Sequence, residues 1–211
     1  MKALVFTGAL TLTLLAAHTH ASQAENSSPS STTSSPHNNS MKFTNYETVG
    51  NLESKYSLGC IELNQLKRQY TPADLFPAAT ACLKEHKYKE SVRLYAAAGT
   101  YGNFDKRRVS DKSAHQAISA LIITTFTPTA KPLKETLEPY FSILEQQNSE
   151  EMSYICKNIE AAGSPSYYPS YMIQHGLNTF NPNAKNPMVN GFDADKNWQS
   201  TLQEYLHCSH Q

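Results

Sequence analysis

Residues 75–98 read LFPAATACLKEHKYKESVRLYAAA, and this run has the pattern of two helices packed antiparallel. Its signals predict one helix over 77–85, a tight turn at 86–88 and a second helix over 89–101, whose end should fray at two glycines. Both helices are short, so they need each other and further helices to bury their apolar faces. The rest of the chain is therefore expected to supply more helices.

This hairpin resembles one tetratricopeptide repeat, which places small side chains where its helices touch and large ones behind them. The continuation over 96–121, AAAGTYGNFDKRRVSDKSAHQAISAL, is loosely similar to the related Sel1-type repeat. No second copy follows at the repeat spacing of about 34 residues, so we do not expect a solenoid. The alternative is that any close-packed helix pair would show the same pattern. The small matching residues are Ala78, Ala79, Ser91 and Ala98, and the large ones are Leu75, Tyr88 and Tyr95.

Helix signals also precede the hairpin. A first helix is expected over Leu58–Arg68, and Thr71 followed by Pro72 is a typical helix start. Pro77 should break or kink the helix that begins there, because proline lacks the backbone N–H.

Helix signals continue after the hairpin as well. Ser110 is expected to cap a helix that carries the clearest amphipathic stripe of the chain, and Ser149 to cap another that ends near Gly163. One kinked or two short helices are predicted over 133–144. Shorter helices are predicted over 169–175 and 195–207. Residues 41–211 are thus expected to form a single all-α domain, a compact helical bundle.

Four cysteines, Cys60, Cys82, Cys156 and Cys208, are expected to form two disulfides. Three pairings are possible. We favour Cys60–Cys82 and Cys156–Cys208, because each would join neighbouring helical segments. Closing loops of these lengths would stabilise the fold by roughly 3 to 4 kcal/mol each in the loop-entropy model.

The N-terminal residues predict export. Residues 1–21 have a basic start at Lys2, an apolar run and a small-residue cleavage site at Ala21, with Ala24 as the alternative. Residues 22–40 are rich in Ser, Thr, Pro and Asn and predict a disordered tether. The apolar run is too short to span a bilayer, and no later run is long enough. We therefore expect a periplasmic or secreted protein without an integral membrane segment after processing.

Charge and motifs exclude several classes of function. Removing residues 1–21 takes away Lys2 and no acid, so 17 basic side chains face 18 acidic ones, a balance that offers no attraction for nucleic acid. The common spacings for nucleophile, zinc, phosphate and dinucleotide chemistry are missing. No cofactor is expected. An active site using His115 or His175 remains as an alternative to a binding protein, and a metal site is a weaker one. Its ligands would be His175, His207, His210 and a reduced Cys208.

Two groups of residues are candidates for contact with a protein partner. Tyr101, Phe104, Arg107 and Arg108 form the first, in a stretch of mixed charge, and combine aromatic and guanidinium groups of the kind enriched at interfaces. The second group is Tyr167, Tyr168 and Tyr171, whose rings can present rigid contact area or close a core. For both groups, a purely structural role is the competing interpretation.

The segments YYPSYMIQHG (167–176) and WQSTLQEYLHC (198–208) resemble uncharacterised exported bacterial proteins that are encoded beside secreted antibacterial effectors. This resemblance implies an immunity protein that neutralises an effector. The expected function is therefore non-enzymatic protein binding. The alternatives are a secreted hydrolase and an envelope assembly factor.

Overall fold

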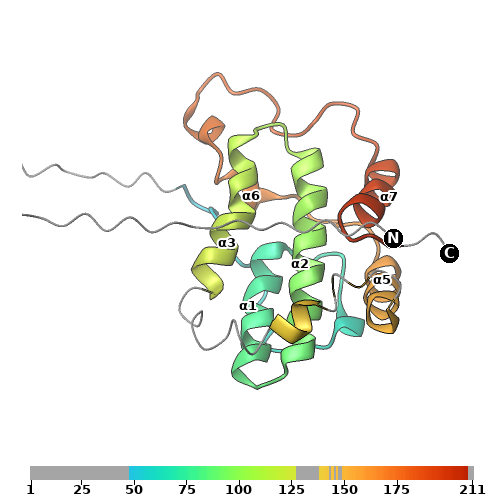
Figure 1. Cartoon of the computed structure of the whole chain (residues 1–211). Coiled ribbons are helices and arrows are strands. Elements are labelled where there is room, and N and C mark those ends of the chain that lie inside the picture. The colour runs from blue at the N-terminus through green and yellow to red at the C-terminus, as the bar shows by residue number, and fades with distance from the viewer. Residues whose placement is uncertain (1–47, 127–137, 143, 145, 147–148, 209–211) are drawn as a thin grey trace, which may run out of the picture. The chain divides into compact units, whose positions relative to one another are not determined.

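The structure is a computed structural model that describes residues 48–126, 138–142, 144, 146 and 149–208 (Figure 1). These residues belong to one unit, Asn45–Gln211. The predicted signal peptide (1–21) and tether (22–40) lie outside the described residues, as does half of the helix predicted over 133–144. The described part of that segment, 138–142 and 144, is helical.

The predicted hairpin is present as helices α1 (Pro72–Lys84) and α2 (Tyr88–Arg108), which lie side by side in Figure 1. The side chain of Thr71 caps α1 by accepting a hydrogen bond from the backbone N–H of Asp74, while the Asp74 carboxylate accepts one from the N–H of Thr71. This reciprocal arrangement satisfies N–H groups that the first turn of a helix leaves unpaired. The small residues predicted to face each other, Ala78, Ala79, Ser91 and Ala98, are all buried.

Two predictions about this hairpin are wrong. Helix α1 runs through Pro77 without a break, because the buried residues on both sides of the proline hold the helix despite the missing hydrogen bond, and the alternative of a kink stays a prediction. Helix α2 does not fray at its glycines but continues to Arg108. A Cβ at Gly102 would lie 2.4 Å from Cδ1 of Ile118, so this glycine permits the close approach of another helix. Gly102 is therefore required by packing against Ile118 and not by an unusual backbone conformation.

The helix predicted over Leu58–Arg68 is also wrong, since only a short 3-10 turn, η1 (Leu63–Gln65), forms there. The backbone before it is held by acceptors on the hairpin. Oδ1 of Asp74 accepts hydrogen bonds from the N–H groups of Lys55 and Tyr56 at 2.6 and 2.9 Å. Within the predicted span, Oε2 of Glu90 accepts a hydrogen bond from the N–H of Leu63 at 3.3 Å.

Helix α2 is the centre of the bundle. Helix α3 (Ala117–Phe126) packs with α1, and α5 (Glu150–Ala162) and α7 (Ala194–Glu204) pack on α2, as Figure 1 shows. The Ser149 cap of α5 and its end at Gly163 are as predicted. The remaining described elements are the short η2 (Ser113–Gln116), α6 (Ser170–Ile173) and η4 (Leu177–Phe180). The described residues contain no strand, and Val109 and Met188 form an isolated antiparallel bridge.

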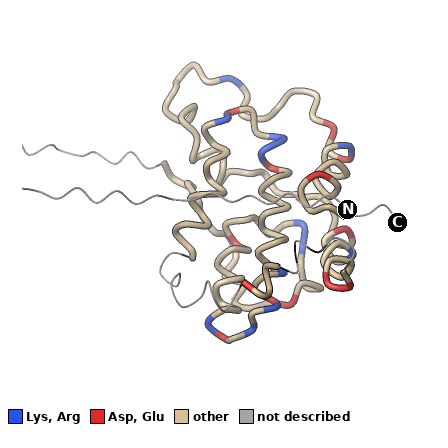
Figure 2. Tube along the Cα trace, in the orientation of Figure 1, with Lys and Arg blue, Asp and Glu red and all other residues tan. Residues whose placement is uncertain are grey.

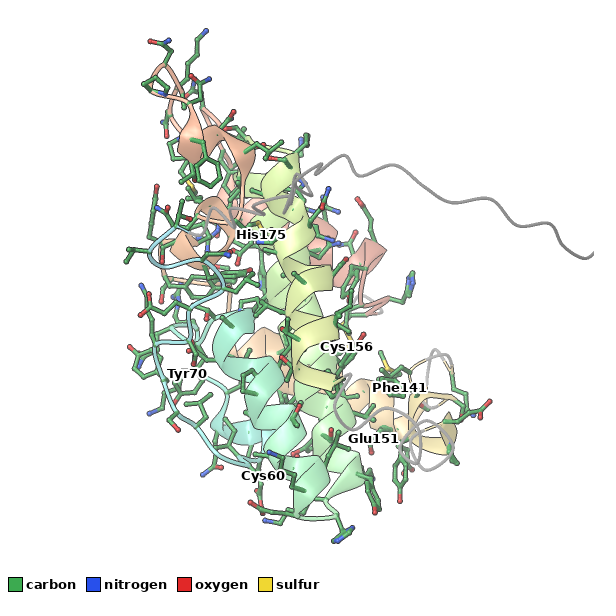
Figure 3. The ribbon with its side chains drawn as sticks, turned by 90° about the vertical axis from the view of Figure 1, so that its left-hand side faces the viewer. Cys60, Tyr70, Phe141, Glu151, Cys156 and His175 are labelled. Atoms are coloured by element: carbon green, nitrogen blue, oxygen red, sulfur yellow. A yellow bond between two sulfur atoms is a disulfide. The ribbon has the colours of Figure 1, made fainter. Side chains whose placement is uncertain are left out.

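Both disulfides pair as predicted, Cys60 with Cys82 and Cys156 with Cys208. The first joins the segment before η1 to α1, and the second joins α5 to the chain beyond α7. Figure 3 labels one cysteine of each bond, Cys60 and Cys156. The single tryptophan, Trp198 of α7, packs against the rings of Tyr101 and Phe104 of α2 at centroid distances of 5.8 and 5.7 Å. The all-α fold with two disulfides is therefore confirmed.

Candidate functional site

A cleft of about 360 Å³ opens where the chain between α6 and α7 meets the end of α2. In Figure 1 this chain, drawn in orange, passes over the ends of α2 and α3 before it enters α7. A volume of this size lies at the lower end of the range for ligand pockets, about 300–1,000 Å³. Its lining residues are Val109, Asp111, Tyr168, Ile173, Gln174, Asn178, Thr179, Ala184, Lys185 and Pro187.

One wall of the cleft is attached to the end of α2 by backbone hydrogen bonds. The N–H of Val189 donates to the carbonyl of Arg108, and the N–H of Ser110 donates to the carbonyl of Pro187, both at 2.8 Å. The Ser110 hydroxyl also donates to the carbonyl of Pro187, at 3.0 Å. The prediction that Ser110 caps a helix is therefore wrong, because its side chain holds this wall instead.

Asp111 holds the opposite wall. Its Oδ1 accepts hydrogen bonds from the N–H and hydroxyl of Ser113 at 2.9 and 2.6 Å, and its Oδ2 accepts one from the N–H of Asn178 at 2.9 Å. Burial raises the pKa of Asp111, but these hydrogen bonds outweigh burial and hold the pKa below its ordinary value of 3.8. A Cβ at Gly176 would lie 2.4 Å from the same Oδ2, so glycine is needed for this close contact. Asp111 is an ionised anchor whose oxygens face donors within the protein.

Beneath the cleft, a buried polar cluster ties the 167–171 segment to α2. Asp105 is fully buried, and its Oδ2 accepts hydrogen bonds from the hydroxyls of Tyr167 and Tyr171 at 2.9 and 2.7 Å. Its Oδ1 accepts one from Nε of Arg108 at 2.8 Å. Burial raises the pKa of Asp105, and the charge of Arg108 and the two hydroxyls oppose that rise. Burial also raises the pKa of both tyrosines, which therefore remain protonated donors.

The first predicted partner-binding group lies on helix α2, which continues to Arg108. Tyr101, Phe104 and Arg108 are buried, so they pack within the domain and are not available to a partner in this structure. The Arg108 guanidinium lies 5.2 Å from the ring centre of Phe104. Arg107 is partly exposed, and its Nη2 pairs with Oε2 of Glu204 at 2.7 Å.

The second predicted group divides between core and surface. Tyr171 is buried and Tyr167 is half-buried, because both hydroxyls reach Asp105. Tyr168 points away from this cluster, is 54% exposed and lines the cleft. Of the seven predicted residues, Tyr168 is the one that lines the cleft, and it stays a candidate contact residue.

Three exposed apolar residues beside the cleft were not predicted. Leu177, Phe180 and Val189 are 71%, 49% and 39% exposed. Leu177 and Phe180 are three residues apart in a 3-10 turn, so they share one face of it. A signal was present in the sequence, since residues 163–192 contain Lys185 and neither Asp nor Glu. In Figure 2 the chain that follows α6 is tan apart from one blue position.

The two histidines considered for catalysis have structural partners. His115 Nε2 lies 2.9 Å from the carbonyl oxygen of Val109, and His175 Nδ1 lies 2.9 Å from Oδ1 of Asn51. Burial lowers the pKa of His175 below its ordinary value of 6.5, which favours the neutral imidazole. Figure 3 shows His175 toward one end of the domain and Cys60 toward the other. Neither of these contacts joins a histidine to a carboxylate.

The metal site considered above would need a thiolate from Cys208, but this cysteine is bonded to Cys156. Within the described ranges, no group of three or more His, Cys, Asp or Glu side chains is placed to hold a metal ion. His210, one of the ligands considered, lies outside those ranges.

Comparisons of the chain with protein-family models, curated proteins and solved structures found no match. None of the helices in the described part of the chain has the length and apolar character needed to cross a membrane. Function is therefore inferred from the cleft, its anchors and its exposed apolar residues.

Proposed function

We propose that the mature chain is an exported, non-enzymatic domain that binds another protein through the face around the cleft. The observation that carries this proposal is the 163–192 segment, which has a single charged residue and exposes Tyr168, Leu177, Phe180 and Val189. Protein interfaces are depleted of charged residues at their centres and enriched in aromatic ones. Large exposed apolar groups around a cavity are typical of interaction sites.

The anchoring of this face also favours binding. Hydrogen bonds to Arg108, Ser110 and Asp111 hold both walls of the cleft. A surface that is already held in one conformation loses less conformational entropy when a partner binds. The segment is therefore suited to recognition despite its lack of long helices.

The compartment proposed is the periplasm or the extracellular space. Two disulfides favour an oxidising environment, and residues 1–21 have the composition of an export signal. In the sharper form of the proposal, the partner is a secreted antibacterial effector and this chain is the immunity protein that neutralises it. The resemblance of 167–176 and 198–208 to proteins encoded beside such effectors supports this form.

Two other functions are weaker proposals. A secreted hydrolase would need a base, but His115 contacts a backbone carbonyl and His175 contacts the Asn51 amide. An envelope assembly factor would use the same binding face, and gene neighbourhood separates it from an immunity protein, because an immunity partner is encoded beside its effector.

The test captures the partner from envelope extract on the mature protein and then measures its affinity for purified variants. Leu177→Asp places a charge in the proposed face and should weaken binding at least tenfold, about 1.4 kcal/mol. Ile123→Asp is the matched control, since Ile123 is a 61% exposed aliphatic residue on α3 and should leave affinity unchanged. If both variants bind the partner as the wild type does, the face is not the binding site. Inhibition of a toxic enzyme by the mature protein would support the immunity form, and turnover of an ester, peptide or sugar would contradict it.

A further inference from the structure

We propose that the cleft binds an extended peptide segment of the partner in which an acidic side chain lies close to an apolar one. This inference rests on the proposed function and names the chemistry that the cleft recognises. The apolar side chain packs against Ile173 and Pro187, and the carboxylate faces Lys185.

The size and apolar lining of the cleft suit side chains from a single strand of a partner. A volume of about 360 Å³ is small for a cofactor of dinucleotide size but has room for a few side chains. Ile173 and Pro187, both partly exposed, provide apolar surface beside the exposed ring of Tyr168. An aliphatic or aromatic side chain inserted there removes apolar surface from water on both molecules.

Two unused amides suit a peptide backbone. The side chains of Gln174 and Asn178 line the cleft, and no hydrogen bond within the described part of the chain involves their amide groups. Each amide offers two donors and an acceptor, which match the carbonyl and N–H groups of an extended chain. Their backbones are already held, Asn178 by Asp111 and Gln174 by Ser170.

Charge favours an acidic group over a basic one. Lys185 is the one ammonium group among the residues that line the cleft, and no salt bridge joins it to a described carboxylate. The carboxylate of Asp111 already accepts three hydrogen bonds from within the protein. Lys185 is therefore the charged group of the cleft that can pair with a partner, because the oxygens of the ionised Asp111 are occupied by donors, and a carboxylate of the partner complements the ammonium group.

The surroundings favour a protein over a glycan. Leu177 shares one face of the η4 turn with Phe180, and the intervening Asn178 and Thr179 line the cleft. Leu177 is 71% exposed, and an aliphatic side chain in that position is stabilised by apolar contact, which a protein surface supplies more fully than a hydroxylated sugar.

The experiment titrates the ¹⁵N-labelled mature protein, with its disulfides intact, with blocked heptapeptides and follows the amide resonances by NMR. The first peptide is Gly-Ser-Leu-Glu-Leu-Ser-Gly, and two others replace Glu by Gln or by Lys. We expect shifts centred on the side-chain amides of Gln174 and Asn178. At low salt the Glu peptide should bind about two- to fivefold tighter than the Gln peptide, because an exposed ion pair contributes little more than this, and the Lys peptide should bind weakest.

Variants assign the charge effect to one residue. Lys185→Gln should remove the difference between the Glu and Gln peptides, whereas Lys112→Gln, an exposed lysine that does not line the cleft, should preserve it. Equal binding of all three peptides, a difference that survives Lys185→Gln, or no shift at millimolar peptide would overturn the inference. If chitotriose shifts the same amide resonances and the peptides do not, the inference is overturned in favour of a glycan. Failure here is distinct from failure of the proposed function, because Leu177→Asp tests partner binding independently of peptide chemistry.

Discussion

Replacing Asp105 by alanine should destabilise the domain severely. Asp105 is fully buried and is the acceptor for three donors, Arg108, Tyr167 and Tyr171. The substitution leaves the Arg108 guanidinium buried without its carboxylate and removes the acceptor of two tyrosine hydroxyls.

The magnitude follows from the partner that is left behind. Removing one member of a buried ion pair costs about 3–5 kcal/mol, because the other charge stays buried without compensation. A domain of ordinary stability has about 5–15 kcal/mol in total, so Asp105→Ala should lower the free energy of unfolding by a large fraction. Asp105→Leu combined with Arg108→Met removes both charges. It should recover the part of the loss that comes from the uncompensated guanidinium, while the hydroxyls of Tyr167 and Tyr171 still lack their acceptor.

Urea unfolding followed by the fluorescence of Trp198 measures both changes, since Trp198 packs on Tyr101 and Phe104 beside the cluster. Glu160→Ala is the control, because Glu160 is exposed on α5 and its loss should change the free energy by less than about 0.5 kcal/mol. A loss below about 1 kcal/mol for Asp105→Ala, or equal losses for the single and double variants, would refute the assignment of a buried ion pair.

Three further outcomes are expected. Gly102→Ala should lower the free energy of unfolding by about 1–2 kcal/mol, because a Cβ would lie 2.4 Å from Cδ1 of the buried Ile118 and overpacking exceeds the gain in helix propensity; thermal unfolding with no loss would contradict this. Replacing Cys156 and Cys208 together by alanine should lower the free energy of unfolding by roughly 4 kcal/mol, the value that the loop-entropy model gives for a sequence separation of 52 residues. A urea midpoint equal to that of the wild type would contradict this prediction. Burial raises the pKa of Glu151, but the cationic side chains of Arg93 and Lys89 lower it more. The contribution of Glu151 to stability is therefore present above the ordinary pKa of 4.5 and is lost as pH falls through the lowered pKa. Glu151→Gln should therefore flatten the loss of stability in acid, and identical acid profiles would show that the pairs contribute nothing.

The parts of the fold that local sequence determines could be predicted. The Thr71 and Ser149 caps are short-range hydrogen bonds, and both appear where the sequence indicates them. The pairing of Cys156 with Cys208 could be predicted because it joins α5 to the end of α7, whereas the pairing of Cys60 with Cys82 is correct although Cys60 lies outside a helix. The structure of the segment that leads into η1 could not be predicted, since the acceptors that hold its backbone come from Asp74 and Glu90 on the hairpin.

The candidate site was harder to predict, because the burial of α2 was underestimated. Tyr101, Phe104, Asp105 and Arg108 recur at i, i+3, i+4 and i+7, which is one face of a helix. Two charged residues within that stripe made it resemble a solvated segment. The cleft itself joins residues 109–111 to 168–187, which lie far apart in the sequence, so no local pattern could place them together.

The end of α2 links stability to recognition. Asp105 holds Tyr167 and Tyr171 on either side of the exposed Tyr168, and the carbonyl of Arg108 accepts the hydrogen bond that holds Val189. An apolar replacement of the ion pair can fill the same space, but it offers no acceptor to the two hydroxyls that orient this segment. The double variant that recovers part of the free energy of unfolding should therefore still bind the partner more weakly than the wild type. Filling the buried space recovers part of the stability, whereas the position of Tyr168 depends on the directed hydrogen bonds of its two neighbours.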